Sequence, residues 1–335
     1  MLTYTIRRLL LAIPTLLFIA LVIFLLLELA PGDPMAQVPL TVPSEVKEQM
    51  RDALGLGEPT HIRFGKWMWQ FFVIEPMVWS DATFGTDYAT GKQRVISWQT
   101  RSAVMDIVVQ RLPQTLWVVA LSYVVGILIA LPIGIYSAYR QYSVFDQVGT
   151  FVTMVGYSVP PFFSGVLVIV IFSVHLGWLP SIYDTTHRVV DWDSFVIQLR
   201  QMVMPVMVLA LQTTAQISRF MRASMLDNLN QDYVRTARAK GLRESTVVMV
   251  HVLRNSMIPV VSVIALGVPQ IFGGAIITEQ IFKVNGLGQL LITAIQANDV
   301  PMVQTVTFML AILIVTFNII ADLLYGVLDP RIRYE

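Results

Sequence analysis

The sequence predicts an all-α polytopic membrane protein with six transmembrane helices and a large external insertion after the first helix. Composition is the first observation behind this prediction: 55% of the 335 residues are hydrophobic and only 13% are charged. A soluble domain carries about 25% charged residues, and the mean hydropathy here is +0.65. The chain therefore has too few polar side chains to cover the surface of a water-soluble globular protein.

Long uncharged stretches are the second observation. A helix needs about 20 mostly apolar residues to cross the hydrocarbon of a bilayer. Six stretches reach or approach this length: 9–27, 112–139, 147–183, 201–218, 255–278 and 300–321. They are too long for the strands of a membrane barrel, which need about 10 residues. The third is long for one crossing, so we expect it to end near His175, before LGWLP.

The first stretch could be mistaken for a secretory signal. The apolar core of a signal is about 7–15 residues long and precedes a cleavage site of small residues. This run is longer and continues into LAPGDP, with no such site. We therefore expect a retained N-terminal transmembrane helix.

Three parts are expected along the chain: a transmembrane helix at 1–30, an extracytoplasmic insertion at 31–111, and five helices at 112–335 that include a cytoplasmic loop at 219–255. Within the insertion, Ser44 is a good cap for a helix over SEVKEQMRDAL. The aromatic segment RFGKWMWQFF suits a membrane interface, where Trp is enriched. The rest, to about Asp106, has a loop-like composition.

Orientation follows from the Lys and Arg residues of short loops, which concentrate on the cytoplasmic side. If the N-terminus is cytoplasmic, the short outer loops carry only Arg188, Arg200 and Lys283. The inner segments then carry many more: Arg7, Arg8, Arg140, Arg219, Arg222, Arg235, Arg238, Lys240, Arg243, Arg254, Arg331 and Arg333. Both termini are therefore expected in the cytoplasm.

No catalytic or metal site is expected in the chain. It has no cysteine, and its four histidines (His61, His175, His187 and His251) lack partners at the spacing of helical metal ligands. The nearest match to a phosphate-binding loop, GTDYATGKQR, has the wrong glycine spacing and a glutamine in place of the required hydroxyl. We expect no hydrolysis of nucleotide by this chain, and the net charge of +1 suggests no nucleic-acid partner.

Ionisable residues inside transmembrane helices are expensive and often functional. Glu28 and Asp322 lie at the ends of the first and last stretches, where their side chains can reach water. A proton-coupled carrier would need carboxylates near the middle of the bilayer, and the six stretches contain none. This weighs against a standalone carrier or channel.

The polar segment 231–244, QDYVRTARAKGLRE, lies between two apolar stretches. In a helix, Tyr233, Ala237 and Gly241 recur every four residues and share one face, while Arg235 and Arg238 share another. Gly241 would permit a sharp turn. Two interpretations remain open from the residues alone: a basic loop attracted to anionic lipid headgroups, or a docking element for a cytoplasmic partner.

This segment resembles the cytoplasmic "EAA" loop of permease subunits from ATP-binding-cassette (ABC) importers, in the peptide/nickel branch. Gly241 is retained, but Arg235-Thr236-Ala237 replaces Glu-Ala-Ala, and Leu253-Arg254 replaces the Leu-Pro of the consensus. Further motifs of the branch occur in the same order: IRRLLLAIPTLLFI, LAPGDP, RLPQTL, GYSVPPFFSG, LGWLPS, VNGLGQLLITAI and LDPRIRYE. The resemblance covers nearly the whole chain, least of all the insertion.

The resemblance implies the fold of a type I ABC importer permease in a bacterial inner membrane. It implies three kinds of partner: a second homologous permease subunit, two cytoplasmic ATPase subunits that bind ATP and Mg²⁺, and an external solute-binding protein. It also implies that the cytoplasmic helix docks in a groove of an ATPase subunit. In that role Tyr233 and Ala237 would pack in the groove, Arg235 and Arg238 would pair with carboxylates, and Gly241 would permit the turn.

The translocation pathway is expected between this chain and its partner permease, with Gln212, Thr213, Gln216 and Gln270 as candidate lining residues. Burial of these side chains against a neighbouring helix is the alternative. By the resemblance, the expected solute is a peptide, with a nickel chelate, glutathione or a glycoside-like compound as alternatives. A membrane receptor or scaffold that does not transport is a function of another class.

Overall fold

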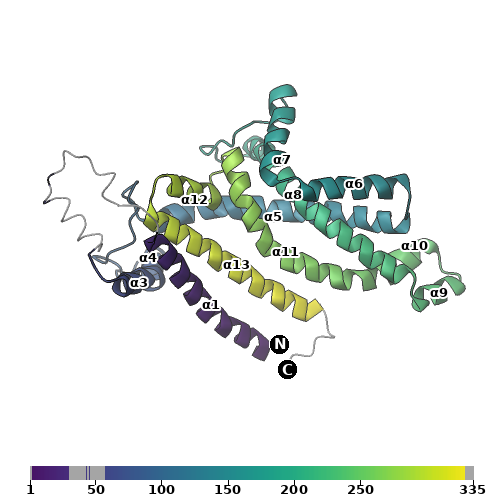
Figure 1. Cartoon of the computed structure of the whole chain (residues 1–335), viewed down its shortest axis with the longest axis horizontal. Helices are drawn as coiled ribbons and strands as arrows, with labels where there is room; N and C mark the ends of the chain where they lie inside the picture. The colour runs from purple at the N-terminus through teal and green to yellow at the C-terminus, as the bar shows by residue number, and fades with distance from the viewer. Residues whose placement is uncertain (1, 30–42, 44, 46–56, 329–335) are drawn as a thin grey trace. The chain divides into compact units, whose positions relative to one another are not determined.

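The computed structural model describes residues 2–29, 43, 45 and 57–328. Helices dominate this part of the chain (Figure 1), and within it the one extended pairing is an isolated bridge between Ile96 and Ala103. The elements are α1 (Leu2–Glu28), α3 (Thr60–Trp69), the π-helix η1 (Gln70–Ile74), α4 (Glu75–Phe84), α5 (Val104–Tyr139), α6 (Val144–Ser158), α7 (Pro161–Val168), η2 (Ile169–His175), α8 (Trp192–Leu229), α9 (Asp232–Ala239), α10 (Glu244–Thr246), η3 (Val247–Val252), α11 (Leu253–Phe282), α12 (Leu287–Gln296) and α13 (Val300–Leu328).

Five helical segments of the described chain are long and apolar enough to cross a membrane as single helices. They are Tyr4–Glu28, Val104–Tyr139, Trp192–Leu229, Glu244–Phe282 and Val300–Leu324. A sixth candidate is a bent pair, Val144–Ser158 with Pro161–His175. The prediction of a helical membrane protein is confirmed, and the six predicted spans correspond to these six segments.

The third predicted span differs from the expected single helix. It ends at His175, as expected, but its two halves meet at an angle of 108°. The cause lies in the sequence VPP: a residue that precedes proline is driven out of the helical region. Val159 and Pro160 accordingly have extended backbone angles, with ψ of 124° and 142°. A stretch judged by hydropathy alone does not reveal this break.

Several helices extend beyond their apolar stretches. The helix α8 is much longer than the predicted 201–218, because Asp191 caps its N-terminus in a capping box with Ser194 and the helix continues through charged residues on both sides of that stretch. The end of the insertion, expected to be loop-like, contains α4 and the start of α5. Apart from Glu45, which is helical, the helix predicted after Ser44 lies outside the described residues.

The first of two compact units comprises Met1–Ala12, Pro113–Gln289 and Ile312–Glu335. Here α8 is the central helix, and α6, α7 and α11 pack against it. Close approach of α5 to α8 depends on Gly134, because a Cβ atom there would lie 2.6 Å from the Cβ of Met221. Small residues at such crossings let helix backbones pack closely in membranes.

The second unit comprises Ile13–Leu112 and Leu290–Ala311. Its core is aromatic: Trp67 and Phe71 each pack edge-to-face on Phe308, at centroid distances of 5.3 and 4.9 Å. The buried Asp299 carboxylate accepts hydrogen bonds from the Ser97 hydroxyl and from the backbone N–H groups of Trp98, Gln99 and Met302. This carboxylate therefore fixes the loop before α5 to the start of α13.

A second polar cluster in this unit joins α4 to the segment that follows it. Arg94 donates to both oxygens of the buried Glu75, at 2.7 and 3.1 Å, and also pairs with Asp106 at 2.7 Å. Hydrogen bonds to Glu75, followed by those to Asp106, raise the pKa of the Arg94 guanidinium above its usual value. Arg94 therefore remains charged and holds the start of α5 near α4.

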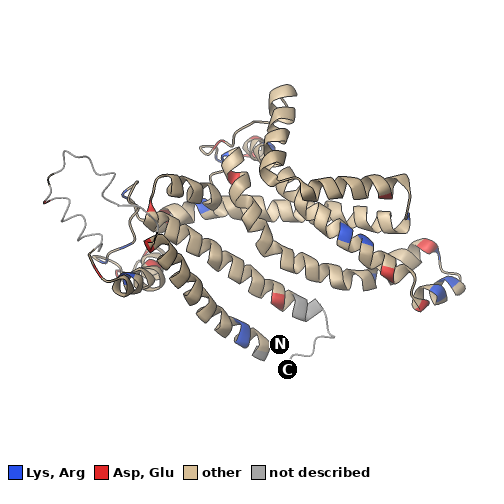
Figure 2. Ribbon diagram, viewed as in Figure 1, with Lys and Arg blue, Asp and Glu red and all other residues tan. Residues whose placement is uncertain are grey.

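Charged residues are sparse in the long helices α1, α5, α11 and α13 and lie towards their ends, whereas α8 also carries Arg219 and Arg222 in its second half (Figure 2). Glu28, at the end of α1, pairs with Arg63 at 2.5 Å. Asp322, in the last turns of α13, pairs with Arg8 at 2.9 Å. Both carboxylates, which we expected simply to reach water, are therefore also neutralised by a cation of the same unit.

Candidate functional site

The predicted cytoplasmic segment forms the short helix α9 and a turn. Asp232 is in the first turn of α9 and Arg238 in its last, the arrangement favoured by the helix dipole. The turn is completed by Gly241, whose φ of +74° lies in the left-handed region that favours glycine. The predicted helix and glycine turn are therefore confirmed.

One face of α9 packs against the chain's own helices. Val234 is fully buried and Ala237 is 6% exposed, in a cluster that includes Val247, Val248 and Val252. Tyr233 packs against the same cluster, and its hydroxyl donates to Asn228 Oδ1 at 2.8 Å. The face predicted to enter an ATPase groove through Tyr233 and Ala237 is thus turned inward, because η3 offers it an apolar surface within the same chain.

The opposite face of α9 is exposed and charged. Asp232 and Arg235 form a loose pair at 3.7 Å, with 97% and 76% of their side chains exposed. Arg238 has a carboxylate partner within the chain: it binds both oxygens of Glu244, at 2.7 and 3.1 Å, and this pairing raises the Arg238 pKa. Within the predicted docking set, Arg235 is therefore the side chain most open to a partner, and the neighbouring Thr236 and Lys240, which were not predicted, are exposed as well.

The four predicted pathway residues are brought together. A cavity of about 400 Å³ in the first unit has Gln212, Thr213, Gln216 and Gln270 in its wall. It lies between α8 and α11, and its other lining residues are Tyr123, Tyr157, Leu209, Ile217, Val263, Gly267, Ile271 and Gly274. The structure thus places these four side chains around one cavity, and their role in lining a translocation pathway stays a prediction.

This cavity is polar without being charged, since none of its lining residues is acidic or basic. Among the described residues, the side-chain amides of Gln212, Gln216 and Gln270 have no hydrogen-bond partner. Each amide offers one acceptor and two donors. The Tyr123 hydroxyl, in contrast, donates to the Ile264 carbonyl. The cavity can therefore form several neutral hydrogen bonds to a solute without requiring a particular charge.

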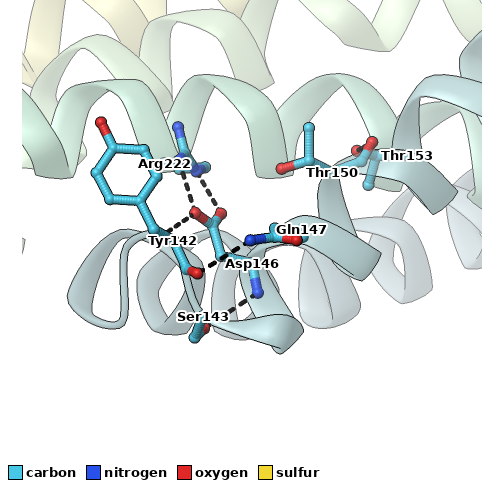
Figure 3. A network of polar contacts seen from close by, with 7 residues as sticks. All are labelled: Tyr142, Ser143, Asp146, Gln147, Thr150, Thr153 and Arg222. Carbon is cyan, nitrogen blue, oxygen red and sulfur yellow. Dashed lines mark hydrogen bonds and ion pairs between the residues drawn. The ribbon is translucent and has the colours of Figure 1, made fainter.

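An ion pair that was not among the predicted sites joins α6 to α8 (Figure 3). Arg222 donates to both oxygens of Asp146, at 2.6 and 2.8 Å. The carboxylate also accepts the backbone N–H of Tyr142 at 2.9 Å, and Ser143 caps the first turn of α6. Both partners adjoin the inner ends of predicted apolar stretches, and that common depth was the available signal.

A buried carboxylate that no sequence pattern indicated lies at the end of α11. Glu279 is fully buried and accepts hydrogen bonds from the Thr115 hydroxyl at 2.7 Å and from the backbone N–H of Gly288 at 2.7 Å. The predicted stretch ended at residue 278 because Glu279 interrupts the uncharged run. In the structure this side chain ties α5 and the start of α12 to α11.

Comparison with known families identifies the chain. Residues 130–334 match the family described as "Binding-protein-dependent transport system inner membrane component", and residues 1–119 match the N-terminal part of such membrane components. The chain belongs to this permease family. The prediction from the cytoplasmic segment and the ordered motifs is thereby confirmed.

Relatives of the permease match it over its full length. It is 36% identical over 339 residues to the oligopeptide transport system permease protein AppB of Bacillus subtilis, with 100% of both chains covered. It is 34% identical over 336 residues to the glutathione transport system permease protein GsiC of Salmonella choleraesuis, again with 100% of both covered. The permease is therefore a subunit of an ABC importer.

Solved structures support the fold. An inward-facing form of the MetNI methionine ABC transporter matches with a TM-score of 0.54 and 18% identity, over 68% of the permease and 98% of that chain. An amino acid ABC transporter matches with a TM-score of 0.52 and 14% identity, over 67% and 95%. The predicted fold of a type I ABC importer permease is confirmed.

Proposed function

We propose that this permease forms half of the passage through which an ATP-driven importer carries peptides delivered by an external solute-binding protein. The observation that carries this proposal is the uncharged polar cavity between α8 and α11, with the unpaired amides of Gln212, Gln216 and Gln270. A second homologous permease subunit would supply the other half. The permease would lie in a bacterial inner membrane with both termini in the cytoplasm.

Peptides suit this cavity because every peptide carries main-chain amides, whatever its side chains. Glutamine side chains have the same donor and acceptor groups as the peptide main chain, so they can pair with it through neutral hydrogen bonds. A cavity without fixed charge accepts acidic, basic and neutral sequences alike, and the printed names of the relatives concern oligopeptides and glutathione. Glutathione is the second candidate solute.

The driving force would enter through α9. ATP and Mg²⁺ would be bound by two partner ATPase subunits, and this chain would bind neither. The exposed face of α9 around Arg235 would dock on one of these subunits, while the buried Val234 and Ala237 fix α9 to the transmembrane helices. A partner shifts a conformational equilibrium only through contacts that differ between the two states, and a helix fixed on one side transmits such contacts.

The test uses the complete transporter in proteoliposomes, with the solute-binding protein on the outside and ATP on the inside. We expect ATP-dependent accumulation of a labelled tetrapeptide by the complete assembly and none by the permease alone. Competition with unlabelled peptide or glutathione then separates the two candidate solutes. Uphill accumulation by the permease alone would contradict the proposal.

Docking is tested in the same system with Arg235→Glu. Reversing the charge of a contact at an interface costs several kcal/mol, so we expect ATPase subunits to copurify poorly and uptake to fall at least about tenfold. Arg188→Glu, at an exposed arginine far from α9 in the sequence, is the matched control and should behave as wild type. Normal coupling in Arg235→Glu would rule out docking through this face.

A further inference from the structure

A second cavity, of about 590 Å³, lies within the unit that contains the insertion. Its lining comes from the last turns of α1, from α3 and the residues just before and after it, from the segment that follows α4 and from the first two turns of α13. The lining residues are Phe24, Glu58, Arg63, Lys66, Trp67, Gln70, Gln93, Arg94, Val95, Ile96, Trp98, Val300, Pro301 and Gln304. It shares no residue with the proposed passage.

Three side chains of this lining have a buried polar atom without a hydrogen-bond partner among the described residues. They are Nε1 of Trp67, Nε2 of Gln304 and Oε2 of Glu58. Trp67 is 5% exposed and Gln304 is 8% exposed. A buried donor or acceptor left unpaired costs about 1–3 kcal/mol. A ligand that forms hydrogen bonds with these atoms removes that cost, and small rotations of the three side chains would bring the atoms to the ligand.

The lining offers both hydrogen-bond donors with positive charge and a carboxylate acceptor. Trp67 and Gln304 offer N–H donors, and Arg63 and Lys66 offer positive charge next to them. Arg63 pairs with Glu28 and Lys66 with Glu58, but a guanidinium has five N–H donors and an ammonium three, so both retain donors for a ligand. The unpaired Glu58 oxygen provides a single acceptor. This set suits a molecule with an anionic oxygen group and an amine.

The position of the cavity indicates where that molecule would come from. Phe24 lies one turn before the end of the candidate span Tyr4–Glu28, and Pro301 lies in the first turn of the candidate span Val300–Leu324. Such ends meet the headgroup layer of a bilayer. Trp67 and Trp98 in the lining are residues enriched at that depth.

We propose that this cavity binds the headgroup of a zwitterionic phospholipid that carries both a phosphate and an amine. The phosphate accepts hydrogen bonds from Trp67 and Gln304 and pairs with Arg63, and the amine donates to Glu58. The acyl chains lie against the apolar side chains of α1, most of which are exposed in the chain by itself. This site is independent of the solute that the permease carries.

The experiment measures thermal unfolding of the full-length permease in detergent micelles and counts bound lipids by native mass spectrometry. The probes are phosphatidylethanolamine, phosphatidylglycerol, soluble glycerophosphoethanolamine and inorganic phosphate. We expect phosphatidylethanolamine to raise the melting temperature and to remain bound, phosphatidylglycerol to do so more weakly, and the two soluble compounds to have little effect. Trp67→Phe and Gln304→Leu each remove one donor, and each should weaken phosphatidylethanolamine binding about three- to tenfold.

Control variants distinguish the loss of a hydrogen-bond donor from a general loss of structure. Trp69→Phe changes the same residue type on the same helix at an exposed position outside the cavity, and it should bind the lipid as wild type does. Gln304→Leu should melt at or above the wild-type temperature without lipid, because the donor it removes is unpaired. Glu58→Gln should abolish the preference for phosphatidylethanolamine over phosphatidylglycerol.

Several results would overturn the proposal. One is equal stabilisation of wild type and both donor variants by every lipid, which would indicate a water-filled cavity and only general solvation. Another is equal binding of soluble glycerophosphoethanolamine, which would indicate that the ligand is a free phosphate ester and not a membrane lipid. A third is a variant-sensitive shift produced by the solute-binding protein but by no lipid.

Discussion

The ion pair between Asp146 and Arg222 is a strong test of the helix packing described above. We expect Arg222→Gln to destabilise the first unit, because it leaves the Asp146 carboxylate buried with the Tyr142 N–H as its remaining strong donor. Asp146 has only 4% of its side chain exposed, whereas Arg222 has 28%. The substitution therefore removes the partner of the more buried charge.

The magnitude follows from that asymmetry. Breaking a buried ion pair by removal of one partner costs about 3–5 kcal/mol, and the partial exposure of Arg222 places this pair at about 3 kcal/mol. Asp146→Asn should cost less, about 1–2 kcal/mol, because the amide oxygen can still accept one hydrogen bond and Arg222 can reach water. In the double variant the two costs should not add, and the coupling energy should be at least about 1 kcal/mol.

The assay is equilibrium unfolding in mixed detergent micelles, with wild type, both single variants and the double variant under the same conditions. Arg219→Gln is the matched control on α8, since Arg219 makes a cation–π contact with Tyr157 at 5.0 Å and should cost less than about 1 kcal/mol. An Arg222→Gln variant that is destabilised no more than this control, or single-variant costs that simply add, would contradict a stabilising ion pair between Asp146 and Arg222.

Two further predictions concern other parts of the chain. Gly286→Ala should lower the melting temperature and cost about 1–3 kcal/mol, because its Cβ would overlap the buried Glu279 carboxylate, whereas the control Gly273→Ala meets nothing within 4 Å and should be nearly neutral. Hydrogen bonds, of which the one from the Thr86 hydroxyl has the largest effect, lower the pKa of Asp81 below its usual 3.8. The turn over residues 85–89 that these bonds stabilise should therefore be fully formed above pH 3.8 and should open as the pH falls through the lowered pKa. Amide exchange of the turn, corrected for its intrinsic pH dependence, would contradict this if Asp81→Asn left it unchanged at neutral pH.

Hydropathy and proline placement account for much of the fold. The six apolar stretches predicted the membrane spans because each helix satisfies its own backbone hydrogen bonds, so that a span can be recognised without knowledge of its neighbours. Even the 108° break after α6 is encoded locally, by VPP, although a hydropathy window averages over it.

The candidate sites were less accessible from the sequence. Gln212, Thr213, Gln216 and Gln270 were recognised as polar residues in apolar stretches, and the structure places all four around one cavity. The partners of Glu279 could not be predicted, because Thr115 is 164 residues away in the chain. Tyr233 and Ala237 were predicted to pack in a groove of an ATPase subunit, but in the structure they pack within the chain. The sequence does not show that η3 covers Ala237.

The sequence alone predicted a helical membrane protein with a short polar helix and a glycine turn, and its motifs resembled the permease family to which the chain belongs. Periodicity, apolar length and backbone restriction are properties of neighbouring residues, and a linear pattern records them. Only the tertiary structure decided which polar groups pair, which face of α9 stays exposed and where unpaired donors line a cavity. Those outcomes depend on short-range contacts between residues far apart in the chain, which no local pattern specifies.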